Sequence, residues 1–125
     1  MPGRRKQPMA VIGAGSWGTA LAIQLARAGI PARLWGRDLG QMHAMQLLRC
    51  NERYLPGAAF PAALEIAADL RAALDGARDV LVVVPSPAFR ATLQLVGRHL
   101  SRDARVAWAT KGFEISSGLL PHQIA

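Results

Sequence analysis

The chain has a single cysteine, Cys50, among 125 residues, and only eight of its residues are Asp or Glu. A lone cysteine excludes an internal disulfide and fits a reducing compartment. We expect Cys50 to be a small packed residue rather than a nucleophile. No apolar run approaches the roughly 18 residues of a membrane span, and the N-terminus lacks the apolar core of a secretory signal. The sequence therefore predicts a cytoplasmic protein without membrane insertion.

Few acidic residues leave a net charge of +7. Such a charge suits nucleic acid, an anionic surface or a phosphate-bearing ligand. The only tight basic cluster is residues 4–6, and the other cations are scattered without a row of aromatic side chains for base stacking. We interpret residues 1–8 as a disordered, solvated basic tail and expect no nucleic-acid partner.

Three histidines, His43, His99 and His122, lack the spacing of metal ligands, and we expect them to be exposed or partly packed on helices. Neither Ser86 nor Ser101 belongs to a recognisable Ser-His-Asp arrangement. The sequence predicts no metal site.

A glycine-rich stretch, Gly13-Ala-Gly-Ser-Trp-Gly18, follows an apolar run and precedes an alanine-rich segment. It indicates a strand, a tight turn and a helix start. Gly13 would permit the turn, Gly15 would let a pyrophosphate approach the backbone, and Gly18 would let the helix lie close to the strand. Free amides at the helix start would then face phosphates. Because the spacing alone is weak evidence, the rest of the chain has to support it.

Strand and helix patterns alternate along the whole chain. This alternation predicts one α/β domain over residues 9–125: a Rossmann-type doubly wound parallel sheet that is incomplete at its C-terminus. Gly29 would end the first helix, and Asp69 would cap the third. The expected strands are 9–12, 32–35, 64–67, 80–84 and 105–109; the expected helices are 17–28, 39–50, 70–77 and 88–100; 51–61 is expected to be an irregular loop, and 118–125 the start of a helix.

Ligands of such sheets bind outside the carboxyl ends of the strands. Four places qualify, and we expect them to converge on one crevice. They are Ser16-Trp17, Gly36-Arg37, Pro85-Ser86 and Thr110-Lys111-Gly112.

The end of the second strand bears on the choice of cofactor. An NAD site usually carries an acidic residue about 20 positions after the glycine motif, where this chain has Arg37, with Asp38 behind it. An arginine can pair bidentately with a 2′-phosphate. We therefore favour NADP over NAD. The alternative is a solvated Arg37 paired with Asp38.

Lys111 follows the last expected strand, where the nicotinamide end of a cofactor should point. Its ammonium could hold a substrate phosphate or polarise a carbonyl. A surface lysine in a strand-to-helix loop is the alternative.

Five ordered motifs resemble the N-terminal domain of bacterial NAD(P)-dependent glycerol-3-phosphate dehydrogenase, from about residue 8 to the end. The motifs are Gly13 to Ala22, Leu34 to Arg37, Asn51 with Tyr54 to Pro56, Val82 to Ser86, and Ala109 to Glu114.

The resemblance implies reduction of dihydroxyacetone phosphate to sn-glycerol 3-phosphate for phospholipid synthesis. It implies that Ser16, Trp17, Arg37 and Tyr54 contact the dinucleotide and that Lys111 contacts both cofactor and substrate. The family continues into a helical domain with the catalytic lysine, which we expect beyond Ala125. The chain is then a fragment without a catalytic residue of its own, compatible with a homodimer in its full-length form.

Two other functions stay open. The chain could be a stand-alone dinucleotide-binding or sensing module, because it contains no positioned general acid or base. It could also belong to a related reductase that acts on another phosphorylated or acidic substrate.

Overall fold

The computed structural model describes residues 7–100 and 102–108, with the side chain of Ser86 left out. The predictions for the tail at residues 1–6, for the helix start at 118–125 and for Lys111 fall outside the described residues. No helix within the described ranges is long and apolar enough to cross a membrane.

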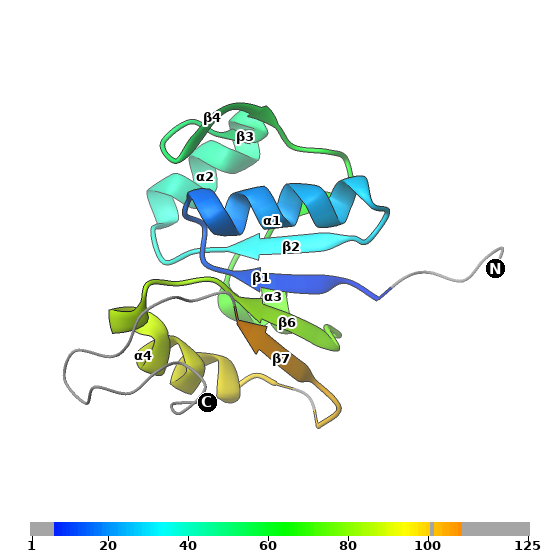
Figure 1. Cartoon of the computed structure of the whole chain (residues 1–125), viewed down its shortest axis with the longest axis vertical. Helices are drawn as coiled ribbons and strands as arrows, with labels where there is room; N and C mark the ends of the chain where they lie inside the picture. Colours follow the sequence, from blue (N-terminus) through cyan, green and yellow to red (C-terminus); the bar gives the residue numbers. More distant parts are fainter. Residues whose placement is uncertain (1–6, 101, 109–125) are drawn as a thin grey trace, which may run out of the picture.

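A five-stranded parallel sheet forms the centre of the molecule (Figure 1). The spatial order is β5-β2-β1-β6-β7, which is 3-2-1-4-5 when these five strands are counted along the chain. This is the order of a Rossmann-type doubly wound sheet, so the predicted fold class is confirmed. The strands are β1 (Met9–Ile12), β2 (Ala32–Trp35), β5 (Leu64–Ile66), β6 (Asp79–Val82) and β7 (Arg105–Trp108).

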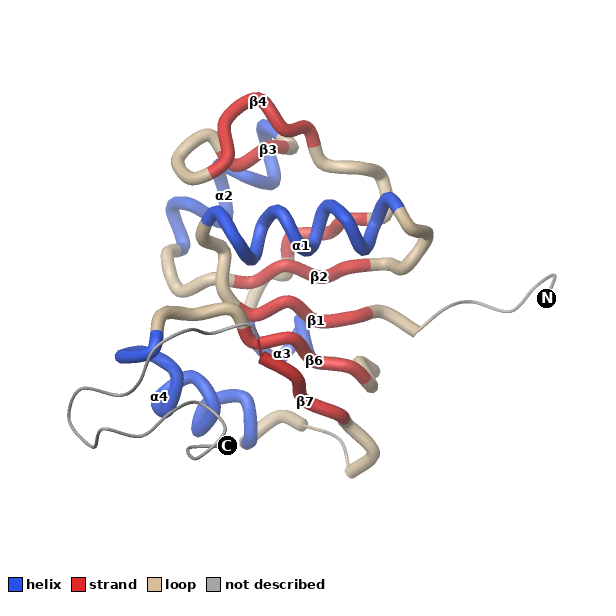
Figure 2. Tube along the Cα trace, viewed as in Figure 1, coloured by secondary structure: helices blue, strands red, loops and turns tan. Residues whose placement is uncertain are grey.

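Helices cover both faces of the sheet (Figures 1 and 2). Two of them, α1 (Ser16–Arg27) and α2 (Leu39–Leu48), pack on one face together with a small antiparallel pair of strands. The other two, α3 (Leu70–Leu74) and α4 (Ser86–Gly97), pack on the opposite face. The chain changes face after β5, because α3 packs on the opposite face and leads to β6, which pairs with β1.

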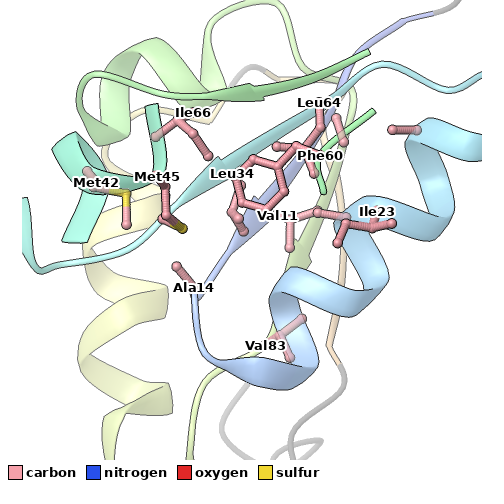
Figure 3. Close-up of a cluster of buried hydrophobic side chains, with 13 residues drawn as sticks. Val11, Ala14, Ile23, Leu34, Met42, Met45, Phe60, Leu64, Ile66 and Val83 are labelled. Carbon is pink, nitrogen blue, oxygen red and sulfur yellow. The ribbon is translucent and has the colours of Figure 1, made fainter. Parts of the chain in front are cut away.

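Two hydrophobic clusters, one on each face, follow from the alternation of side chains along the strands. In β1, Val11 belongs to the cluster under α1 and α2, whereas Ala10 and Ile12 belong to the other. Figure 3 shows the first cluster, with the Phe60 ring among side chains from β2 and β5. The central strands β1 and β6 are therefore buried from both sides, as their apolar sequences predict.

The prediction of an irregular loop over residues 51–61 is wrong. It contains two paired antiparallel strands, β3 (Cys50–Asn51) and β4 (Leu55–Ala59), with a shift of register between Cys50 and Asn51. Pro56 and Gly57 conceal the strand in the sequence, because neither favours extended sheet structure. We call β3, β4 and the turn between them the hairpin.

Several helix and strand ends also differ from prediction. The second helix stops at Leu48 rather than 50, because Arg49 adopts a left-handed conformation (φ +54°). Its guanidinium donates hydrogen bonds to the carbonyls of Pro61 (2.9 Å) and Leu64 (2.7 Å), which holds it there. The third helix stops at Leu74 rather than 77, before Gly76 at φ +71°.

The bounds of β6 and α4 also differ from prediction, and both elements begin earlier in the chain than expected. The strand covers Asp79–Val82 rather than 80–84, and the helix begins at Ser86 rather than 88. Pro85 is the N-cap and Pro87 lies in the first turn, where a missing N–H breaks no helical hydrogen bond. The two prolines therefore begin the helix as well as ending the strand.

Gly29 ends α1 as predicted. It has φ +86°, and its N–H donates to the Ala26 carbonyl while the N–H of Ile30 donates to the Leu25 carbonyl. This pair of bonds is the Schellman motif, which requires a left-handed residue that glycine adopts without strain.

Candidate functional site

A cleft of about 340 Å³ opens at the carboxyl edge of the sheet, beside the junction of β1 and β6. The chain leaves β1 toward one face and β6 toward the other, so this is the topological switch point at which doubly wound sheets bind ligands. The turns after β1, β2 and β6 and the hairpin all contribute to it. The lining residues are Gly13, Ala14, Gly15, Trp35, Gly36, Arg37, Asp38, Gln41, Tyr54, Val83, Val84, Pro85, Ala88 and Thr92.

Gly13 and Gly18 are required by the packing of the chain on itself. Gly13 has φ +122°, and a Cβ there would lie 2.0 Å from the carbonyl oxygen of Val83. A Cβ on Gly18 would lie 1.9 Å from the carbonyl oxygen of Gly13. Gly18 thus lets α1 start directly against the end of β1, as the motif predicts.

Gly15 differs from both, because no described residue occupies the space that its missing side chain leaves. Its φ is −77°, which any residue adopts, and no atom lies within 4 Å of the position of a Cβ. It is the N-cap of α1 and provides no side-chain hydrogen bond to the first turn. The first amides of the helix therefore stay available at its positive end, an arrangement that fits the phosphate groups of a dinucleotide.

The other residues predicted after β1 and β6 begin helices at this edge. Ser16 and Trp17 are the first two residues of α1 and are exposed, Trp17 by 58%, but they do not line the cleft itself. Pro85 lines the cleft, and Ser86 is the first residue of α4.

Arg37 and Asp38 lie side by side in the lining but do not pair. Arg37 is exposed and makes no ion pair or hydrogen bond with the described part of the chain. Asp38 instead accepts a hydrogen bond from the Gln41 backbone N–H (3.1 Å) as the N-cap of α2, and its other oxygen contacts Arg53 (3.3 Å). The Arg37–Asp38 pair of the alternative is therefore not formed, although Arg37 is exposed to solvent as that alternative expects, and no described residue occupies its guanidinium.

The hairpin brings Tyr54 to the same cleft. Tyr54 is 41% exposed, and the centroid of its ring lies 5.1 Å from the guanidinium carbon of Arg53, a cation–π distance. Because Arg53 also contacts Asp38, one cation joins the hairpin to the N-terminus of α2. Four elements that are remote in sequence thus bring Gly13, Gly15, Arg37, Tyr54 and Pro85 into one cleft.

Three polar residues at or beside the cleft were not found by sequence reasoning as parts of the site. Asn51 is 1% exposed, and its Nδ2 donates to the carbonyl oxygen of Ala14 (3.0 Å) and to Oγ1 of Thr19 (2.8 Å). Gln41 donates from Nε2 to the same Ala14 oxygen (2.8 Å). Thr92 on α4 lines the cleft and is 2% exposed. The sequence gives no periodicity that marks such residues, since their importance lies in contacts between distant segments.

Cys50 is half-buried in a second pocket of about 320 Å³ between α2 and the hairpin. Its thiol donates a hydrogen bond to Oε1 of Glu52 (3.1 Å), and this bond, with desolvation and the charge of Glu52, raises the pKa of Cys50. A raised pKa disfavours the nucleophilic thiolate. His43 and His99 are exposed, and the described ranges contain no group of three or more His, Cys, Asp or Glu that could hold a metal ion.

Comparison with known families gives a match over residues 8–125. The matching family is described as NAD-dependent glycerol-3-phosphate dehydrogenase N-terminus. This match agrees with the resemblance that the five motifs carry.

Individual relatives agree with the family match. The chain is 54% identical over 117 residues to a glycerol-3-phosphate dehydrogenase [NAD(P)+] of Yersinia pestis, covering 94% of this chain and 34% of the relative. It superimposes on a crystal structure of glycerol-3-phosphate dehydrogenase from Coxiella burnetii with a TM-score of 0.90 and 43% identity, covering 97% and 37% of the two chains. A putative ketopantoate reductase from Ralstonia solanacearum shares the fold, with a TM-score of 0.65 and 24% identity over 87% and 33% of the chains.

Proposed function

Because the chain belongs to the NAD-dependent glycerol-3-phosphate dehydrogenase family, whose N-terminal part it matches, we propose that it is the dinucleotide-binding part of an NAD(P)H-dependent reductase. The reaction proposed for the whole protein is reduction of dihydroxyacetone phosphate to sn-glycerol 3-phosphate. The chain spans about a third of the length of the curated relatives it matches. Its own share of the activity is therefore the binding and orientation of the cofactor.

The observation that carries this proposal is the open space at Gly15 in the switch-point cleft. The amides at the start of α1 would hold the pyrophosphate, and the absence of a Cβ would let it reach them. Tyr54, on the rim of the cleft, would contact the dinucleotide as its match to the family motif implies, and so would Ser16 and Trp17 on the first turn of α1. Pro85 and Ser86 would bound the site on the side of α4.

We further propose a preference for NADP over NAD, which rests on Arg37. The guanidinium lies in the lining without a partner among the described residues, whereas the neighbouring carboxylate of Asp38 is held by Arg53 and by the N-terminus of α2. A 2′-phosphate would therefore meet an available cation rather than an uncompensated carboxylate.

Catalysis would need residues that follow this part of the family. When bound, the nicotinamide supplies the hydride; a lysine expected beyond Ala125 would serve the reacting carbonyl, and Lys111 would contact cofactor and substrate phosphate. We also propose that the protein is cytoplasmic, that it serves phospholipid synthesis and that its full-length form is a homodimer.

A matched pair of glycine substitutions tests the nucleotide site. At both Gly15 and Gly97 no atom lies within 4 Å of a new Cβ, but only Gly15 lines the cleft. Gly15→Ala should leave the melting temperature within a few degrees of the parent and weaken NADPH and NADH binding, followed by nicotinamide fluorescence, by about tenfold or more. Gly97→Ala should bind both as the parent does. Equal affinities in the two variants would refute the pyrophosphate position.

One specific observation favours a second function, that of a binding module without chemistry. Among the described residues, the polar side chains in the cleft lining are Arg37, Asp38, Gln41, Tyr54 and Thr92, and none of these is a histidine or lysine that could transfer a proton. NADPH oxidation with dihydroxyacetone phosphate should be assayed with this chain and with a version extended to the length of its relatives. Turnover in the extended version alone supports the dehydrogenase; binding without turnover in both supports the module.

A further inference from the structure

The carbonyl of Ala14 lies in the middle of the glycine-rich turn and accepts two side-chain hydrogen bonds. One comes from Nδ2 of Asn51 on β3 (3.0 Å) and the other from Nε2 of Gln41 on α2 (2.8 Å). Both donors are uncharged amides from segments outside the turn. The direction of this carbonyl is therefore set by the hairpin and α2, not by the turn alone.

Fixing this carbonyl also fixes the next amide. A peptide group is planar, and in the trans form its C=O and N–H point in opposite directions. The Ala14 carbonyl points toward Asn51 and Gln41, so the N–H of Gly15 points away from them. That N–H has no partner among the described residues, and it belongs to the residue whose missing side chain leaves the open space in the cleft.

Asn51 is held too firmly to be an incidental neighbour. It is 1% exposed, and both hydrogens of its amide are used, the second by Oγ1 of Thr19 (2.8 Å), which is itself fully buried. Its Oδ1 accepts the backbone N–H of Tyr54 (3.2 Å). A single side chain thus connects the turn, the first helix and the segment that carries Tyr54.

We propose that Asn51 is a positioning residue for dinucleotide binding: through the Ala14 carbonyl it orients the Gly15 amide toward the pyrophosphate, and through the Tyr54 amide it sets the rim of the same cleft. This inference rests on the proposed function. The pyrophosphate is common to both cofactors, so Asn51 acts on NADPH and NADH alike. It differs in this from Arg37, for which we propose a contact with the 2′-phosphate of NADPH alone.

Asn51→Asp tests the proposal with almost no change in volume. The carboxylate has no hydrogen to donate to the Ala14 oxygen and repels it, while Oδ1 can still accept from Tyr54. We expect NADPH and NADH binding by the 125-residue chain to weaken together by about tenfold or more. The amide resonance of Gly15 should also move in the ligand-free protein, and its response to NADPH should be reduced.

A control variant separates positioning from loss of stability. Leu74→Ala removes a side chain that is 2% exposed on the opposite face of the sheet, away from the turn. Measured well below its melting temperature, it should bind both nucleotides as the parent does and leave the Gly15 resonance in place. If Asn51→Asp does not fold, Gln41→Met is the second variant. It removes the other hydrogen-bond donor to the Ala14 carbonyl oxygen and should weaken the binding of both nucleotides severalfold.

The outcomes are distinct. If folded Asn51→Asp binds both nucleotides as tightly as the parent chain, the positioning role is overturned and the proposed function still stands. The same result in Gln41→Met has the same meaning where Asn51→Asp does not fold. If Leu74→Ala loses as much nucleotide affinity as Asn51→Asp at the same loss of stability, Asn51 has a structural role only. That result also overturns the positioning role. A parent chain that binds neither nucleotide overturns the proposed function itself.

Discussion

At the scale of the residue, the glycines of the motif fall into two kinds. A side chain at Gly13 or Gly18 would clash with the backbone, whereas a side chain at Gly15 would not. A Cβ on Gly13 or Gly18 would lie within 2.0 Å of a backbone oxygen, whereas a Cβ on Gly15 would contact no described residue. The spacing of the motif predicts all three, but it does not distinguish them. Only the folded structure shows that Gly15 is the glycine whose missing side chain leaves space for a ligand.

Arg37 gives a prediction at the same scale. Arg37→Asp replaces a cleft guanidinium that has no partner in the described part of the chain by a carboxylate that would repel a 2′-phosphate. We expect NADPH binding to weaken by about tenfold to a hundredfold and NADH binding to change little, because NADH lacks that phosphate. Fluorescence titration with each nucleotide measures the difference.

The control for this change is Arg78→Asp. Arg78 is exposed and lies directly before β6, at the amino edge of the sheet, so the variant has the same net charge without touching the cleft. It should retain the NADPH preference of the parent. Equal losses of NADPH and NADH in Arg37→Asp would remove the 2′-phosphate assignment.

At the scale of the element, a helix start that is marked by a capping side chain can be predicted from the sequence, because that signal is local. Asp69 accepts a hydrogen bond from the Ala72 N–H (2.7 Å) as the N-cap of α3, as predicted. Helix and strand ends set by distant contacts are not readable. Arg49 ends α2 with bonds to carbonyls 12 and 15 residues further on, and the hairpin forms because β3 and β4 pair with each other.

A capping prediction follows for α3. Asp69→Ala should lower the free energy of unfolding by about 1 kcal/mol and the melting temperature by about 4–8 °C. Asp75→Ala is the matched control, because Asp75 is the C-cap of the same helix and its carboxylate caps no amide. Thermal melts followed by circular dichroism compare the two. A loss in Asp75→Ala as large as in Asp69→Ala would contradict the capping contribution.

At the scale of the whole molecule, the cleft joins the two layers of the fold. Its lining includes Ala14 and Val83 from one hydrophobic cluster and Val84, which packs against the other. A ligand bound in the cleft would contact elements on both faces of the sheet at once. Binding should therefore stabilise the fold as a whole.

Nucleotide should raise the melting temperature of the entire chain in a single transition. At a concentration a hundred times its dissociation constant, NADPH adds about 2.7 kcal/mol of stability, which corresponds to a rise of roughly 10 °C or more for a domain of this size. Calorimetric scans with increasing NADPH measure it. An unchanged melting temperature at concentrations that saturate the fluorescence signal would show binding outside the folded cleft.

The sequence by itself determined the doubly wound sheet, the order of most elements, the glycine turn and the family, because these depend on local periodicity, on capping and turn residues and on ordered motifs. Only the tertiary structure decided that Asp38 pairs with Arg53 and not with Arg37, and that Asn51 and Gln41 hold the carbonyl of Ala14. Each of these depends on which distant segments meet at the carboxyl edge of the sheet. No periodicity within one segment encodes such a meeting, since its energy comes from partners 15 to 37 residues apart.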